Sequence, residues 1–558
     1  MNFPAAFLRL LFRRPGEAMR ILGWWLAGKR VRARNRLHIG AGGQNDDYDA
    51  WIATVECDAD EATPSATGEG PLFAIWLVED GGDAACTRAS IAALNWPDAA
   101  RVAIVSGRDG SVVKAALAMI GAEWVIPVAA GTRLAPLALR RFGEAIADRP
   151  EAQVVYGDHD QADATGRRTL PWFKPLWNPD LFLAQDYLSQ ACAIAAPALA
   201  SALDDAAPGD AATIFALLLA ITSRPDARVV HVPHVLAHLP DVFLAAAPAA
   251  RMAVLERHFA GSGATFSAGA ANTVHVSWPL PAPLPLVSVI VPTRDNLALA
   301  RACVDSVLSR TGYRPLEIII VDNGSVSPGM LAWLDRIADH PAVRVLRDDG
   351  PFNFSAINNR AARVARGDYL CLLNDDTEVR EGAWLAELMR HAVRPDVGAV
   401  GARLVYGDGS IQHAGVTIGL GGSAGHAHRF QPPGATGWFH RADVTHAVSA
   451  VTGACLVVAR RKFEAVGGLD ETAFAVAFND VDLCLKLQRA GWRTIYEPRA
   501  MLTHHESKSR DRQRDPARAG QFQAELAELR RRWQTDSLVD PLFHPRLDRS
   551  QETYRLKL

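Results

Sequence analysis

Apolar runs alternate with helix-like stretches along the second half of the chain. The predicted order is strand, helix, strand, strand, helix, strand, over residues 287–291, 297–309, 316–321, 343–346, 355–366 and 369–373. Strands that alternate with helices are typical of a mostly parallel sheet covered by helices on both faces. We therefore predict an α/β, Rossmann-like domain in this half.

Polar residues follow three of these strands directly. They are Pro292, Thr293, Arg294 and Asp295 after the first strand, Asp322 and Asn323 after the second, and Asn374, Asp375 and Asp376 after the fourth. Parallel sheets bind ligands at the carboxyl ends of their strands. One such acid would be an ordinary turn residue or helix cap, but three polar strand ends on one edge favour a site for a nucleotide and a metal ion.

Composition narrows the class of protein. The chain has 558 residues, 49% of them hydrophobic and 22% charged, which indicates a globular protein of several domains. Lys and Arg number 59 against 61 Asp and Glu, so the net charge of −2 gives no reason to expect nucleic acid as a partner. Seven cysteines without a Cys-x-x-Cys spacing favour neither a disulfide framework nor a zinc site, and they point to a reducing compartment.

The first 36 residues differ from the rest in charge. They carry nine basic side chains and one acidic one, Glu17, among many apolar residues that include Trp24 and Trp25. The apolar stretch at 21–28 is far shorter than the roughly 20 residues that span a membrane. Two interpretations stay open: residues 1–36 contact the anionic inner face of the cell membrane as a peripheral segment, or they form a solvated basic helix that packs on the protein itself.

Six motifs, in order, resemble the family 2 glycosyltransferases of the GT-A fold. They are VSVIVPTRD, EIIIVDNGS, ARGDYLCLLNDDTEV, TGACLVVARRKFEAVGGLDE, FNDVDLCLKLQRAGW and LTHHESKSR, and they cover most of residues 285–512. The resemblance implies transfer of a sugar from a nucleotide-diphosphate donor.

The resemblance assigns residues to the donor. It implies nucleotide-binding roles for Pro292, Thr293, Asp295, Asp322, Asn323 and Asp375. The family's metal motif is Asp-x-Asp; here Asn374 replaces the first carboxylate, which leaves Asp376. With a histidine, Asp376 would hold Mg²⁺ or Mn²⁺. His504 matches the family position better than His505, although the choice between them stays open. Ser507 to Arg510 follow and are suited to a diphosphate.

The resemblance also implies a general base. Asp480 is the base, and Thr452, Gly453, Ala454 and Asn479 line the donor and acceptor pocket. The family usually has Glu where Asn479 stands. Asp480 begins a helix-like stretch, so a role as a first-turn acid is the alternative. The resemblance further implies inversion at the anomeric carbon.

The first half repeats the layout without the acids. Between residues 72 and 188 the same elements can be traced, but Val128, Ala129, Ala130 and Gly131 stand where the second half has Asn374 to Thr377. We interpret it as a degenerate GT-A-like domain. Trp172, Phe173, Trp177 and Asn178 suggest either a platform for a sugar or core packing.

The expected organisation is therefore two GT-A domains in tandem. Its parts are a leader at 1–45, a degenerate domain at 46–280, a catalytic domain at 281–515 and a C-terminal helix and tail at 516–558. We expect an inverting, metal-dependent glycosyltransferase of bacterial surface polysaccharide or lipopolysaccharide synthesis that acts in the cytoplasm or at the inner membrane face. Its acceptor would be a saccharide or a lipid-linked molecule. The alternatives are a nucleotidyltransferase, for which the loop after the first strand lacks a Gly-rich, Arg/Lys-bearing sequence, and a non-catalytic carbohydrate-binding or scaffold protein.

Overall fold

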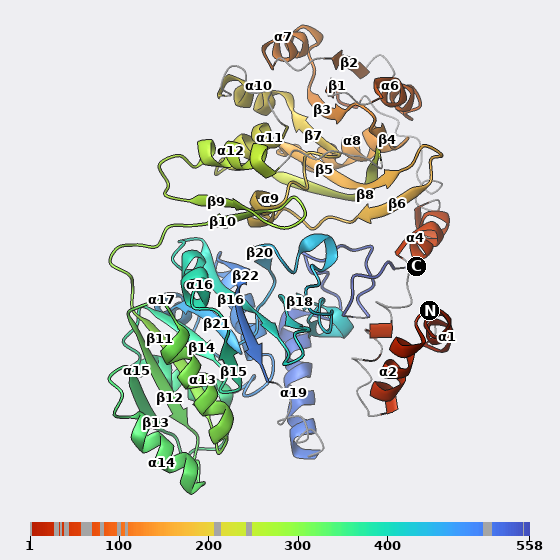
Figure 1. The fold of residues 1–558 in the computed structure, drawn as a ribbon. Coiled ribbons are helices and arrows are strands. Elements are labelled where there is room, and N and C mark those ends of the chain that lie inside the picture. The colour runs from red at the N-terminus through yellow and green to blue at the C-terminus, as the bar shows by residue number, and fades with distance from the viewer. Residues whose placement is uncertain are drawn as a thin grey trace.

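The computed structural model contains two α/β units, each built around one sheet (Figure 1). It describes residues 3–26, 33, 36–37, 44–56, 70–78, 83–96, 102–106, 110–205, 214–240, 248–505, 516–550 and 552–557. The first unit lies above the second in Figure 1, and the C-terminal segment runs between them. Among the described residues, no helix is long and apolar enough to cross a bilayer.

The second unit has a ten-stranded sheet. In spatial order its main strands are β13 (Val343–Arg347), β12 (Leu316–Asp322), β11 (Val287–Thr293), β14 (Tyr369–Leu373), β21 (Cys455–Ala459), β16 (Val397–Val405), β22 (Arg493–His504) and β15 (Thr377–Val379). β17 (Ile411–His413) pairs with β16, and β20 (His446–Val448) pairs with β22. The four strands from β13 to β14 are parallel, and β21 is antiparallel to β14. The parallel strands predicted from the sequence are confirmed.

Helices cover both faces of this sheet. They are α13 (Leu297–Arg310), α14 (Pro328–Ile337), α15 (Phe354–Val364), α16 (Trp384–Ala392), α17 (Arg460–Ala465), α18 (Asn479–Arg489) and α19 (Pro516–Trp533). The strands bury side chains on both faces, into two separate apolar cores. Two short strands, β18 (Thr417–Ile418) and β19 (Ala424–Gly425), form a separate pair.

The first unit has an eight-stranded sheet of the same design. In spatial order its strands are β2 (Val102–Ser106), β1 (Phe73–Val78), β3 (Trp124–Ala129), β7 (Cys192–Ala195), β5 (Val154–Ala162), β8 (Val229–Pro240) and β4 (Arg133–Leu134), with β6 (Arg168–Trp172) beside β5. Its helices are α6 (Ala84–Ala92), α7 (Gly110–Ile120), α8 (Ala138–Asp148), α9 (Pro179–Ala184), α10 (Ala196–Asp205), α11 (Ile214–Thr222) and α12 (Pro248–His258). A hairpin of β9 (Thr265–Ala268) and β10 (Val274–Ser277) follows.

The two sheets follow the same sequence of parallel and antiparallel pairs. From β2 to β4 and from β12 to β15 the order is parallel, parallel, antiparallel, antiparallel, parallel, antiparallel. Each sheet also has a register shift in its long parallel pair, after Gly157 in β5 and after Ala402 in β16. The first half is therefore a structural repeat of the second.

These shared register shifts align the two halves residue by residue. With Gly157 matched to Ala402, Gly131 takes the place of Asp376 and Leu239 takes the place of His504. The sequence alone aligned Val128 with Asn374, and this alignment was wrong by one residue. In the structure, Ala129 corresponds to Asn374. At both expected metal-ligand positions the first half has a residue with no ligand atom in its side chain.

The two units are joined through buried polar contacts. Asn178, at the start of α9, donates from Nδ2 to the carbonyl of Ala447 (2.9 Å) and accepts from the amide of Ala447 (3.2 Å). The buried carboxylate of Asp180 pairs with Arg394 (2.6 Å) and with Arg493. Since each contact joins the first unit to the second, the units share one interface.

The C-terminal segment and the N-terminal helix α4 (Gln44–Trp51), which continues as a π-helix over Ile52–Glu56, complete this interface. One apolar cluster draws residues from α4, both units and the tail: Tyr48, Trp51, Phe173, Val235, Leu420, Ala427, Trp438, Phe543, Leu547 and Leu556. Of the residues considered as a sugar platform, Trp172 stacks on Phe439 of the second unit with centroids 4.6 Å apart, and Phe173 is fully buried in this cluster. Both rings are therefore used in packing, as in the core-packing alternative.

His544 of the C-terminal tail reaches a buried acid of the first unit. Asp158 accepts from His231 Nε2 (2.9 Å) and His544 Nε2 (2.8 Å), and all three are close enough to hold a metal ion. However, His544 Nδ1 accepts the amide hydrogen of Arg546 (3.0 Å). A neutral imidazole that accepts at Nδ1 carries its proton on Nε2, so His544 has no lone pair there for a metal. Burial acts to raise the pKa of Asp158, but the two histidines outweigh it and lower that pKa.

Replacing Asp158 by Ala is expected to destabilise the protein by about 3 kcal/mol or more, because two buried histidines lose their acceptor. The measurement is the unfolding midpoint in denaturant or on heating. Asp204→Ala is the control: Asp204 pairs with Lys114 at the surface, and exposed pairs contribute about 0.2–1 kcal/mol. Equal small shifts in both variants would contradict a structural role for the Asp158 cluster.

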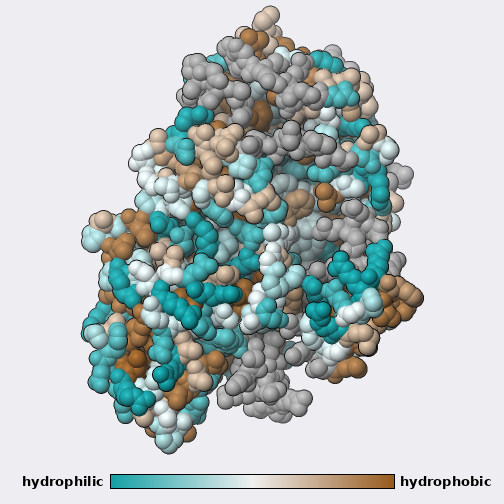
Figure 2. Space-filling view, in the orientation of Figure 1, coloured by the Kyte–Doolittle hydropathy of each residue, from teal (hydrophilic) through white to brown (hydrophobic). Residues whose placement is uncertain are grey.

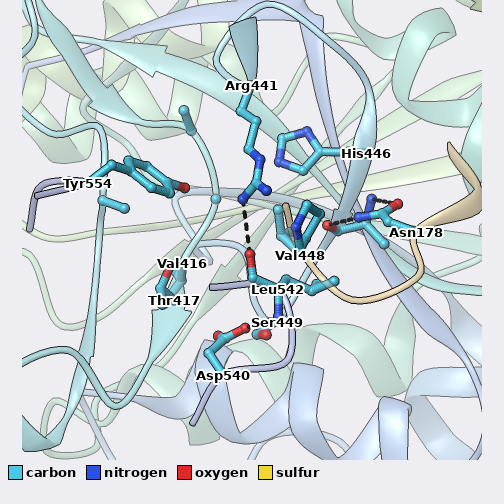
Figure 3. Close-up of a pocket in the computed structure, with 15 residues that line it drawn as sticks. Asn178, Val416, Thr417, Arg441, His446, Val448, Ser449, Asp540, Leu542 and Tyr554 are labelled. Carbon is cyan, nitrogen blue, oxygen red and sulfur yellow. Dashed lines mark hydrogen bonds between the residues drawn. The ribbon is translucent and has the colours of Figure 1, made fainter. Parts of the chain in front are cut away.

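A small cavity of about 20 Å³ lies in the interface (Figure 3). Asn178, His446, Ser449, Asp540 and Tyr554 are among the residues that line it. Arg441 points across it and donates to the carbonyl of Leu542 (3.0 Å). This volume accommodates about one water molecule. The cavity is therefore a packing feature of the interface between the units and is too small for a sugar nucleotide.

Candidate functional site

The loops after β11 and β14 meet at the carboxyl edge of the second sheet. Thr293, the last residue of β11, donates its hydroxyl hydrogen to Asp375 Oδ2 (2.7 Å), just beyond β14. Burial raises the pKa of Asp375 to about 6, against the lowering effect of the Thr293 hydrogen bond. The sequence prediction that these strand ends share one edge is confirmed.

Asp376 and His504 lie against each other at this edge. His504 ends β22 and is paired with Thr377 of β15, which brings its Nε2 to 3.0 Å from Asp376 Oδ1. Burial acts to raise the pKa of Asp376, but the contact with His504 outweighs it, and the pKa lies below its usual value. Asp376 Oδ1 and His504 Nδ1 are buried, and neither makes a well-directed hydrogen bond within the described part of the chain.

His505 faces away from this pair. Its amide donates to the carbonyl of Asp376 (2.8 Å), while its ring lies 3.3 Å from Glu378 Oε2 and is about one third exposed. Successive side chains of a strand point to opposite faces, so the structure brings His504 and not His505 to the Asp376 side chain.

A loop over residues 452–454 connects Asp480 with the metal motif. Gly453 donates its amide hydrogen to Asp480 Oδ2 (2.8 Å), and the carbonyl of the next residue, Ala454, accepts from the amide of Asn374 (3.1 Å). Thr452 Oγ1 accepts from the amide of Ala454 (3.3 Å). The expected base, pocket loop and metal motif therefore lie in one continuous group.

Asp480 stands in the first turn of α18 and is held there from two sides. Its Oδ1 accepts from the amide of Val481 (2.8 Å), and its Oδ2 from Gly453. Burial raises the pKa of Asp480, against the lowering effect of these two backbone hydrogen bonds. Asn479, beside it, is buried and donates to the carbonyl of Val476 (3.0 Å), so it closes the turn before the helix.

Helix α19 supports the turn that precedes Asp480. Phe478 has a positive φ of 60°, which is strained for a residue with a bulky side chain. Glu525 of α19 accepts from the amides of Val476 (3.2 Å) and Ala477. Arg532 of the same helix donates to Asp482 (3.0 Å) on α18. The C-terminal helix thus fixes α18 and the position of Asp480.

The loop after β12 holds the residues expected around the nucleoside. Asp322 is buried; its Oδ1 accepts from the amide of Ser325 (3.1 Å), and its Oδ2 pairs with Arg347. Asn323 donates from Nδ2 to the carbonyls of Asp348 (3.1 Å) and Gly350 (3.0 Å). Its amide oxygen is buried without a hydrogen bond to any described residue, so it remains available as an acceptor.

Asp295 differs from these residues because it is exposed and binds the backbone. Its Oδ1 accepts from the amides of Val326 (2.9 Å) and Ser327 (2.8 Å), and these hydrogen bonds lower its pKa. Asp295 therefore joins the loop after β11 to the loop after β12. Pro292 is buried within β11, opposite Val321. The expected diphosphate group, Ser507 to Arg510, lies outside the described residues.

Three groups at this site were missed from the sequence. Arg347 and Glu525 are separated from their partners by 25 and 48 residues, and no local pattern links them. The third is a histidine pair, His413 and His426, whose Nδ1 atoms lie 2.9 Å apart. His413 is fully buried on β17, and burial lowers its pKa to about 3. Four histidines within residues 413–440 were the available signal for this pair.

A family model matches part of the second unit. Residues 288–439 match the model of the family described as Glycosyl transferase family 2. The matched segment includes Thr293, Asp322 and Asp376 but ends before Asp480 and His504.

Three similar proteins place the family match in context. The chain is 37% identical over 389 residues to the O-antigen biosynthesis protein RfbC of Myxococcus xanthus, covering 68% of this chain but only 30% of that protein. It is 29% identical over 228 residues, 38% of this chain and 72% of that protein, to an N-acetylglucosaminyl-diphospho-decaprenol L-rhamnosyltransferase of Mycobacterium tuberculosis. A solved mannosyltransferase from Pyrobaculum calidifontis, in complex with GDP-Man and Mn²⁺, is 22% identical with a TM-score of 0.36, covering 48% of this chain and 70% of that chain.

Proposed function

We propose that this protein is an inverting glycosyltransferase that moves a sugar from a nucleotide-diphosphate donor to a saccharide or lipid-linked acceptor of a bacterial surface polysaccharide. The observation that carries the proposal is the hydrogen-bonded chain from Asp480 through Gly453, Ala454 and Asn374 to the Asp376–His504 pair. A base and an acid–imidazole pair at one sheet edge are what transfer from a metal-bound diphosphate requires.

Asp480 would accept the proton of the acceptor hydroxyl. The hydrogen bond from the Gly453 amide orients the Asp480 carboxylate, and the dipole at the first turn of α18 favours the negative charge of this carboxylate. As the carboxylate takes the proton, the acceptor oxygen attacks the anomeric carbon from the side opposite the departing diphosphate. That direction of attack produces inversion. Thr452, Gly453, Ala454 and Asn479 would line the space for donor and acceptor.

Asp376 and His504 would hold a divalent cation, Mg²⁺ or Mn²⁺. The fit is supported by the 3.0 Å approach of His504 Nε2 to Asp376 Oδ1, and by the burial of that carboxylate oxygen without a well-directed hydrogen bond in the described chain. When bound, the cation supplies positive charge that neutralises the departing diphosphate. One protein carboxylate with water and phosphate oxygens is the usual way in which Mg²⁺ is held beside a nucleotide, so Asn374 in place of the family's first Asp is compatible with the site.

The nucleoside would lie over the carboxyl ends of β11, β12 and β14. We propose that Thr293, Asp375 and Asn323 face it, with Pro292 shaping the wall. Asp322 would contribute to nucleoside binding only as an ion pair with Arg347. Asp295 would act through the loop that it holds rather than through direct contact.

The first unit, 46–280, would serve as a brace for the catalytic domain at 281–515. Gly131 and Leu239 stand at its metal-ligand positions, and its sheet is joined to the second unit by Asn178 and Asp180. The helix and tail at 516–558 would hold both units together. We place the enzyme at the cytoplasmic side of the cell membrane, where nucleotide sugars are available.

The deciding experiment is incubation of the full chain with a panel of nucleotide sugars and Mn²⁺. Donor-dependent release of nucleotide diphosphate would support the proposal. Absence of both release and donor binding would favour the non-catalytic scaffold, whereas release of pyrophosphate from a nucleoside triphosphate and a sugar phosphate would favour the nucleotidyltransferase.

The pH dependence of kcat/KM is expected to show an acid limb that belongs to Asp480. The base works only as the carboxylate, and burial raises its pKa, so activity falls as the pH drops through a value above the ordinary aspartate pKa of about 3.9. The profile is measured at saturating Mn²⁺, with calorimetry of Mn²⁺ binding at the same pH values. An acid limb that coincides with loss of Mn²⁺ would contradict its assignment to Asp480.

A further inference from the structure

The N-terminal helices α1 (Phe3–Arg13) and α2 (Pro15–Leu26) form a hairpin with its own small core. Leu10, Ala18, Ile21, Ala33 and Leu37 are buried together, and all five come from residues 10–37. Phe7, Leu11, Trp24 and Trp25 pack against them. The inner face of the hairpin is therefore filled by its own side chains.

The hairpin also exposes four large apolar side chains. Leu8 and Phe12, one turn apart on α1, are 52% and 86% exposed, and Met19 and Leu26 on α2 are 58% and 78% exposed. Figure 2 shows brown, apolar surface on the side of the molecule where α1 and α2 lie in Figure 1. Exposed apolar residues that gather on one small element mark a binding surface rather than ordinary scatter.

The charge of the hairpin selects the partner. Arg13, Arg14 and Arg20 are exposed beside the apolar residues. Glu17, the single acid among the first 36 residues, is paired with Arg36 (2.9 Å) and Arg14 (3.5 Å), so its charge is neutralised within the hairpin. Nine basic residues against this one acid make the sequence of this segment strongly positive.

We propose that the α1–α2 hairpin docks on the surface of an anionic lipid bilayer. Phe12, Leu8, Met19 and Leu26 would enter the boundary between headgroups and acyl chains, while Arg13, Arg14 and Arg20 bind the lipid phosphates. Both helices, at 11 and 12 residues, are too short to span a bilayer. The hairpin therefore lies on the membrane without crossing it, and it holds the enzyme at the surface.

The test is flotation of the full chain with vesicles of phosphatidylcholine alone or mixed with phosphatidylglycerol. We expect binding to the mixed vesicles only, and weaker binding at high salt. Changing Arg13, Arg14 and Arg20 together to Gln is expected to weaken that binding about a hundredfold, and changing Phe12 and Leu26 to Ser about tenfold or more. The vesicles contain no acceptor, so the result is independent of the proposed glycosyl transfer.

Met119→Ser is the matched control, because Met119 is an 89% exposed apolar residue on α7 of the first unit. This variant should float like the wild type, and all variants should keep the wild-type melting temperature because the replaced side chains are exposed. Absence of flotation, equal binding to neutral vesicles, or unchanged binding of both hairpin variants would overturn the proposal.

Discussion

Asp480→Asn is expected to lower glycosyl transfer by about 10²–10⁴-fold, the contribution of a positioned general base. The Asn side chain has the same size, and its amide oxygen can still accept the hydrogen of the Gly453 amide. It cannot take a proton at neutral pH. We therefore expect donor binding to persist while kcat falls, measured as nucleotide diphosphate release and as calorimetry of the nucleotide sugar.

Asp305→Asn is the control for this variant. Asp305 is an exposed acid on α13 whose carboxylate pairs with Arg301 of the same helix. It should retain wild-type kcat and KM. If Asp480→Asn released nucleotide diphosphate as fast as the wild type in the presence of acceptor, another group would have to be the base.

His504→Ala and Asp376→Ala are each expected to weaken Mn²⁺ binding by about a hundredfold or more, since even residues that only orient metal ligands contribute about 10–100-fold. Activity should fall with it. Chelation of the wild type should abolish transfer, and Mn²⁺ or Mg²⁺ should restore it. Mn²⁺ binding is followed by calorimetry in the presence of nucleotide diphosphate, where we expect one nucleotide per chain because the first unit has Gly131 and Leu239 at the matching positions.

His505→Ala provides the matched control. Its ring faces Glu378 at the surface, so Mn²⁺ affinity and activity should stay close to those of the wild type. The opposite pattern, with His505→Ala losing Mn²⁺ and His504→Ala keeping it, would show that the ligand assignment is wrong. A second nucleotide per chain would contradict the degenerate first unit.

Much of the fold could be predicted from local patterns. The continuous apolar runs that begin at Val287, Leu316 and Tyr369 became buried parallel strands, because a strand covered on both faces needs apolar side chains on both. The polar residues that follow them met at one edge, because parallel strands place their carboxyl ends together. The family resemblance agrees with the match of residues 288–439.

Other features depended on contacts between distant residues. The sequence favoured His504 over the adjacent His505 without excluding it. The pairing of His504 with Thr377 decided which ring meets Asp376. Asp295 matched a nucleotide motif, yet its carboxylate binds the backbone of another loop. Trp172 had the chemistry of a sugar platform, but Phe439 of the second unit covers its ring.

The sequence by itself determined the α/β class, the repeat of two units, the family resemblance of the second unit and the residue types at its site. These follow from periodicity and short motifs, which act over a few residues. The tertiary structure alone decided that Arg347 pairs with Asp322, that Glu525 supports the turn before Asp480, and that His544 closes on Asp158. Those partners are brought together by sheet order and by the C-terminal segment, and the physical reason is that hydrogen bonds and ion pairs depend on proximity in space, which short sequence patterns do not encode.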